Sequence, residues 1–72
     1  MSERLLAPKE VASLLGISMA TVNYYTNLGL LKSEERKGNM RLYSRDNAVR
    51  RFAKIRELRK QGYSLKLISH HL

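Results

Sequence analysis

Apolar residues at helical spacing mark the first structural element of the chain. Val11 and Leu14–Leu15 recur every three or four residues and form one apolar stripe. Pro8 suits the first turn of a helix, where its missing N–H group is not needed, and Gly16 can take the left-handed conformation that ends one. The alanine before the proline is a poor N-cap, so the start is weakly marked. The pattern predicts a short amphipathic helix over residues 8–15.

A second helix is predicted after a very short connection. Ser18 is a favourable N-cap, residues 19–28 can run as a helix, and Gly29 can end it. Only Gly16 and Ile17 separate the two helical segments. Two short helices joined through a glycine turn are typical of a helix-turn-helix unit.

The apolar helical spacing stops before residues 34–43, and this segment is predicted to form a β-hairpin. Its two polar arms flank Lys37-Gly38-Asn39, and both glycine and asparagine tolerate the positive φ angle of a tight turn. Neither arm is rich in strand-forming residues, so the hairpin has to pack against another element to be stable.

Two more helices are predicted after the hairpin. Ser44 can cap a helix that runs to about Gln61, and Ser64 can cap a last helix that continues to the end of the chain. The inward arc of the longer helix is expected to consist of Ala48, Val49, Phe52, Ile55 and Leu58. The sequence therefore predicts one domain over residues 1–72. Its fold class is mainly α, a winged helix-turn-helix of about four helices with a small two-stranded wing.

The positive charge is concentrated in the second half of the chain. The 72 residues include 14 Lys and Arg and 6 Asp and Glu, a formal net charge of +8. Residues 1–36 hold as many acidic as basic side chains, so the whole excess lies in residues 37–72. A small basic domain of this kind most often binds a polyanion, and nucleic acid is the first candidate. The alternative is that the positive charge only keeps the surface solvated.

Composition excludes several classes of protein. Cysteine is absent, which excludes disulfides and thiolate zinc sites. No apolar run approaches the roughly 18 residues of a membrane span, and residues 1–8 do not resemble a signal or transit peptide. We therefore expect a cytoplasmic protein without a membrane partner.

The outward side of the second helix carries polar but uncharged residues. Ala20, Asn23, Tyr24 and Asn27 share that side, with Thr21 on its flank. Asparagine can read adenine, alanine and threonine can contact a thymine methyl group, and tyrosine can reach phosphate. A plain polar helix surface explains the same residues about as well, and the basic hairpin beside this helix shifts the balance towards DNA.

Short motifs in a fixed order give the chain a family resemblance. Glu10-Val-Ala12, Leu15-Gly-Ile-Ser18, Tyr24-Tyr25 and Leu28-Gly-Leu30 resemble the helix-turn-helix of MerR-family transcription regulators. Arg36 with Arg41-Leu-Tyr43 resembles the family's wing, and Gly62-Tyr-Ser-Leu65 resembles the joint into its second wing helix. Each motif is weak alone, but their order and spacing cover almost the whole chain.

The resemblance implies a role for each residue. The second helix would enter the major groove, Tyr24 and the Tyr25 hydroxyl would face phosphate, and Arg36 and Arg41 would hold the flanking backbone. Tyr43 would brace the wing more than it contacts a base. The candidate DNA-binding residues are Ser18, Ala20, Thr21, Asn23, Tyr24, Tyr25, Asn27, Arg36, Lys37, Arg41 and Tyr43.

The chain also departs from the family pattern. Asn23 stands where the family usually has arginine, and Thr26 replaces a usual glutamate. Gly38-Asn39-Met40 replaces an Asn-Gly-aromatic sequence in the wing. The resemblance implies a long dimerisation helix and an effector domain in a full-length member, and these 72 residues do not include them. We therefore expect a DNA-binding fragment or stand-alone module that is monomeric alone and homodimeric in a full-length protein.

Two other binding functions remain open. A short basic winged protein can be an excisionase-like architectural DNA-binding protein. The same basic surface can also be captured by an acidic protein partner that mimics DNA.

Catalysis and metal binding are not expected. No nucleophile and base stand in a supporting context, and Ser44 and Ser64 are explained as helix caps. His70 and His71 are adjacent, so they point in different directions on a helix. The sequence predicts no enzyme activity, no cofactor and no metal.

Overall fold

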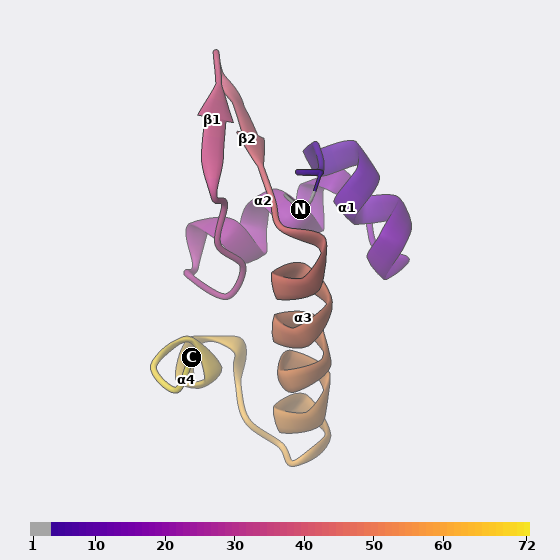
Figure 1. Cartoon of the computed structure of the whole chain (residues 1–72). Coiled ribbons are helices and arrows are strands. Elements are labelled where there is room, and N and C mark those ends of the chain that lie inside the picture. The colour runs from indigo at the N-terminus through magenta and orange to yellow at the C-terminus, as the bar shows by residue number, and fades with distance from the viewer. Residues whose placement is uncertain (1–3) are drawn as a thin grey trace.

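The computed structural model describes residues 4–72, so the first three residues of the predicted domain lie outside the described region. It confirms the predicted fold class, with helices and one antiparallel hairpin in the expected order (Figure 1). The elements are α1 (Pro8–Leu15), α2 (Met19–Asn27), β1 (Glu35–Lys37), β2 (Met40–Leu42), α3 (Arg45–Lys60) and α4 (Leu65–Ser69). The hairpin projects beyond the start of α3, and α4 lies beside the later part of that helix (Figure 1). No helix in the described region is long and apolar enough to cross a membrane.

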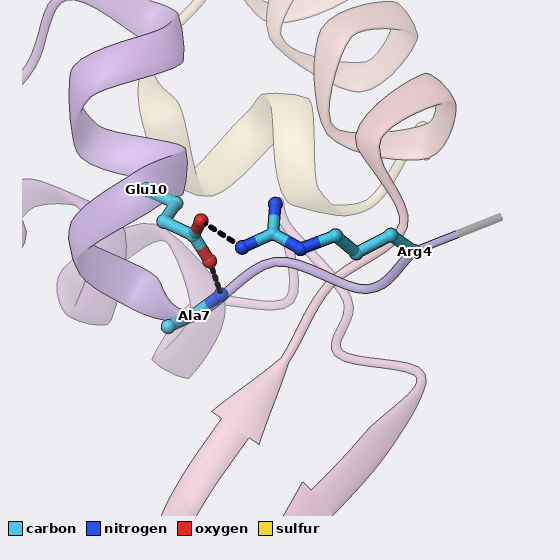
Figure 2. A network of polar contacts seen from close by, with 3 residues as sticks. All are labelled: Arg4, Ala7 and Glu10. Atoms are coloured by element: carbon cyan, nitrogen blue, oxygen red, sulfur yellow. Dashed lines mark hydrogen bonds and ion pairs between the residues drawn. The ribbon is translucent and has the colours of Figure 1, made fainter.

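A carboxylate compensates for the weak N-cap of α1. The Glu10 side chain accepts a hydrogen bond from the Ala7 backbone N–H at 2.9 Å and pairs with the Arg4 guanidinium (Figure 2). The hydrogen bond from Ala7 and the contact with Arg4 lower the pKa of Glu10. Half of a capping box therefore fixes the start of the helix without a capping side chain at Ala7.

The turn between α1 and α2 has the predicted chemistry. Gly16 has φ 71, a left-handed conformation that residues other than glycine rarely adopt. The Ser18 hydroxyl accepts the Thr21 backbone N–H at 3.0 Å and caps α2. The helix ends at Asn27, one residue earlier than the sequence predicts.

The wing is a tight two-residue hairpin. Lys37 pairs with Met40 at its tip, and Arg36 pairs with Arg41 one step further down. Gly38 has φ 62, whereas Asn39 does not take a positive φ. A positive φ at the first turn residue and a negative φ at the second fit a type II′ turn. Only Gly38 therefore takes the positive φ that the sequence allowed at both positions.

The third helix has a narrower buried face than the sequence predicts. Ala48, Ile55 and Leu58 are buried, Phe52 is half-buried, and Val49 is 43% exposed. The expectation for Val49 is wrong: among the described residues, the open hollow that Val49 borders is lined by α3 alone.

The last helix is shorter than predicted. Ser64 caps it as expected, with its hydroxyl accepting the Leu67 backbone N–H at 3.2 Å. The helix then ends at Ser69 rather than at the end of the chain.

One apolar core connects the helix-turn-helix to the wing. The strand bridge between Leu6 and Tyr43 is closed by two backbone hydrogen bonds of 2.8 Å, so the chain start is paired with the end of the wing. The buried core consists of Leu6, Val11, Ala12, Val22, Leu30, Leu31, Tyr43, Ala48, Ile55, Leu58 and Ile68. The position of the wing relative to α2 is therefore set by the core.

Candidate nucleic-acid interface

The outward face of α2 is exposed and carries no charged side chain. Ala20, Asn23 and Asn27 are exposed, and Tyr24 is 54% exposed. These residues lie on the face that the sequence analysis assigned to them. The asparagine amides on this face can hydrogen bond to base edges as well as to water.

The other candidate residues of this region are partly engaged in the fold. The hydroxyl groups of Ser18 and Thr21 lie 2.9 Å apart, and the Ser18 hydroxyl also caps α2. Tyr25 is half-buried against the core, and its ring lies 6.2 Å from the Tyr24 ring, centroid to centroid. Tyr24 is therefore the more accessible of the two neighbouring tyrosines.

Two arginines of the wing face one another across the strand pair. Arg36 on β1 is opposite Arg41 on β2, and neither makes an ion pair with another residue within 4–72. Like charges directly opposite each other on a hairpin are destabilising. An anion between or beside these guanidinium groups would relieve their repulsion. Arg41 is half-buried, and the exposed Lys37 next to Arg36 adds a third cation.

A side-chain hydrogen bond links the wing to α2. The Arg41 guanidinium donates to the Asn27 side-chain oxygen at 3.3 Å. The cationic wing and the uncharged helix face therefore belong to one continuous surface. Sequence reasoning placed both residues in the candidate site but did not predict that they touch each other.

An open groove separates the start of α2 from the wing. It encloses about 500 Å³. Its lining includes Met19 and Asn23 from α2 and Arg36, Lys37, Met40 and Arg41 from the wing. Amide, guanidinium and thioether groups thus converge on one hollow, and the two methionines were missing from the sequence-based candidates.

Tyr43 lies in the core rather than on this surface. It is 1% exposed, and its hydroxyl group is 2.7 Å from the Thr26 hydroxyl. Thr26 donates to the Val22 backbone oxygen at 2.8 Å, which leaves the Tyr43 hydroxyl as the donor towards Thr26. Tyr43 therefore braces the wing against α2, and the departure at position 26 supplies its partner.

Arg51 is a structural contributor that the sequence analysis missed. From α3, its Nε donates to the Leu30 backbone oxygen at 2.7 Å and its Nη2 donates to the Gly29 backbone oxygen at 3.0 Å. These carbonyl groups follow the end of α2, where backbone acceptors lack helical partners. Nothing in the sequence singles out this arginine among the seven basic residues of α3.

Three of the six other basic residues of α3 border a second hollow. Arg56, Arg59 and Lys60 line it together with the half-buried side chains of Tyr25 and Phe52. Arg59 also donates to the Tyr63 backbone oxygen at 3.5 Å. Arg56 and Arg59 are both exposed beside this hollow.

The described part of the chain shows no cluster of metal-ligating residues. Within residues 4–72, no three His, Asp or Glu side chains lie close enough to hold an ion together. His70 and His71 are both exposed, and the His71 ring contacts the Tyr63 ring edge-on at 5.8 Å between centroids.

Residues 6–72 match the protein family described as MerR HTH family regulatory protein. The chain is 41% identical over 63 residues to the HTH-type transcriptional regulator CueR of Bacillus subtilis, which covers 88% of this chain and 43% of that protein. It is 38% identical over 60 residues to the nodulation protein NolA of a Bradyrhizobium strain, covering 82% of this chain and 25% of that protein. The chain thus spans less than half the length of these relatives.

Proposed function

The chain belongs to the MerR helix-turn-helix family of regulatory proteins, and from this membership we propose that it binds double-stranded DNA in the regulation of transcription. The DNA-binding unit consists of α2 and the wing. In this proposal α2 enters the major groove, and the wing from β1 to β2 lies beside it with its basic side chains on the flanking sugar–phosphate backbone.

The chemistry of each part fits a different feature of the duplex. Asn23 and Asn27 hydrogen bond to base edges, whereas Tyr24 donates to a phosphate group. Arg36, Lys37 and Arg41 meet the phosphates electrostatically. Base edges supply sequence preference, and phosphates supply most of the affinity.

The observation that carries the proposal is the contact between Arg41 and Asn27. It joins an uncharged exposed helix face to a wing whose facing arginines make no ion pair within the described residues. A duplex has base edges for the first part and phosphates for the second.

Chemical-shift mapping tests the proposal. The isotope-labelled chain is titrated with a duplex selected from a random-sequence library, at two salt concentrations. We expect the largest shifts at residues 19–27 and 34–42, and an affinity that falls steeply as salt rises. Shifts confined to another region would contradict the proposal.

The isolated chain is proposed to be a monomer that binds one half-site. Family regulators that dimerise join two half-sites, so a single domain has lower affinity than a dimer. Analytical ultracentrifugation of the free chain, followed by titration with duplexes carrying one or two half-sites, measures both properties. Independent binding to the two half-sites is the expected result.

A further inference from the structure

Two exposed methionines from different elements line the groove between α2 and the wing. Met19 begins α2 and is 47% exposed, whereas Met40 begins β2 and is 41% exposed. Both border the hollow of about 500 Å³. Single exposed apolar side chains are ordinary, but two methionines that line one groove, with Pro8 beside five polar or charged residues, favour an apolar group in the partner.

The chemistry of the thioether restricts what this apolar group can be. A methionine side chain donates no hydrogen bond and accepts only weakly, so it contributes apolar contact and adapts its shape to the neighbouring atoms. The amide and guanidinium groups of the groove serve base edges and phosphates. The apolar group that the major groove of DNA presents is the C5 methyl group of thymine.

We propose that Met19 and Met40 form an apolar site for a thymine methyl group, and thereby select thymine at one position of the half-site. The inference rests on the proposed binding of duplex DNA. Met19 and Asn23 are four residues apart on one helix, which places them on one face about 6 Å apart along its axis. Base pairs are about 3.4 Å apart, so the thymine lies within about two base pairs of the one that Asn23 contacts.

Deoxyuridine substitution tests this site because it removes the methyl group and leaves every base-pairing atom in place. A duplex selected by binding to the unaltered chain is resynthesised with each thymine replaced in turn by deoxyuridine. Loss of one buried methyl group is expected to weaken binding about fourfold at the selected position. Other positions are expected to change much less.

The same duplexes are then measured with protein variants. In Met19→Ala and in Met40→Ala we expect the deoxyuridine penalty at that position to fall below about twofold, because the methyl group has lost one wall of its site. Val49→Ala is the matched control, since Val49 is 43% exposed but lies outside this groove. It is expected to keep the full penalty. All three positions are exposed, and thermal unfolding verifies that each variant is folded.

The outcomes separate this inference from the proposed function. A defined binding site with no deoxyuridine penalty at any position overturns the methyl site and leaves DNA binding intact. A penalty that persists unchanged in both methionine variants assigns the methyl contact to another residue and also overturns the inference. Absence of any sequence-dependent binding by the unaltered chain removes the proposed function, and the methyl site with it.

Discussion

Arg41 on β2 donates a hydrogen bond to the side-chain oxygen of Asn27 on α2, over 3.3 Å. The contact connects the wing to the helix that we place in the major groove. It also turns the Arg41 guanidinium towards the helix rather than into solvent. The two halves of the proposed interface therefore present their groups to DNA in a fixed relation.

Removing the amide of Asn27 should weaken DNA binding without unfolding the domain. We expect Asn27→Ala to change the free energy of unfolding by less than about 0.5 kcal/mol, because both partners are on the surface. Binding should weaken several-fold, since Arg41 loses its orientation and the Asn27 amide no longer reaches a base edge. Fluorescence anisotropy with a selected duplex, together with urea unfolding, measures both effects.

Arg41→Gln provides the comparison for Asn27→Ala. It should reduce the slope of log affinity against log salt by about 1, as expected for one lost phosphate contact. The double variant combines Asn27→Ala with Arg41→Gln. If its loss of binding free energy equals the sum of the two single losses, Asn27 does not orient Arg41 and the contact has no functional role.

The hydroxyl of Tyr43 should contribute to stability and not to DNA contact. Tyr43→Phe removes the hydrogen bond to Thr26 and is expected to lower the free energy of unfolding by about 1 kcal/mol. Thr26→Val removes the other partner, and a double-mutant cycle in urea should give a coupling of similar size. The folded Tyr43→Phe protein should bind DNA within about twofold of the unaltered chain. A large loss of affinity with unchanged stability would show that this hydroxyl reaches DNA.

Local sequence chemistry predicted most of the fold. Serine caps, glycine stops and apolar spacing are read within a few residues, so Ser18, Gly16 and Ser44 marked their helices correctly. Val49 was wrongly assigned to the core because helical spacing identifies a face but not the neighbour that covers it. Coverage depends on how other elements pack, which a single sequence does not show.

The candidate interface shows the same division between local and long-range information. The face of α2 follows from helical periodicity, and the charge of the wing follows from composition. The contacts of Arg41 with Asn27 and of Arg51 with Leu30 join residues 14 and 21 positions apart. Pairings across such separations arise from the tertiary fold, and so does the convergence of Met19 and Met40 on one groove.

Arg51 should hold the connection between α2 and the wing in place. Arg51→Met keeps most of the aliphatic length and removes both hydrogen bonds to backbone oxygens. We expect the free energy of unfolding to fall by about 1–2 kcal/mol, since hydrogen bonds from a charged group are lost. Urea unfolding measures this, and NMR should show shifts at residues 29–31. Lys54→Met, on the exposed side of the same helix, is the control and should change neither.

Glu10 should make stability depend on pH in the acidic range. Its pKa is lowered in the folded state by the Ala7 hydrogen bond and by Arg4, from an ordinary value of 4.5. The ionised carboxylate therefore contributes stability above that ordinary value, and the contribution disappears as pH falls through the lower, folded-state pKa. Urea unfolding from pH 6 down to pH 3 should show a larger loss for the unaltered chain than for Glu10→Gln. Parallel curves for the two proteins would contradict this assignment.

Asn23 should determine base preference rather than overall charge attraction. It is exposed on the face of α2 and lines the groove beside the wing. Because its amide is neutral, Asn23→Ala should leave the salt dependence of binding unchanged and reduce discrimination at one base pair by about 1–3 kcal/mol. Binding-site selection from the same random library measures the preference of each variant. Asn23→Arg introduces the residue usual in the family at this position and should steepen the salt dependence while favouring a different base. If Asn23→Ala selects the same site with the same affinity, this side of α2 does not face the bases.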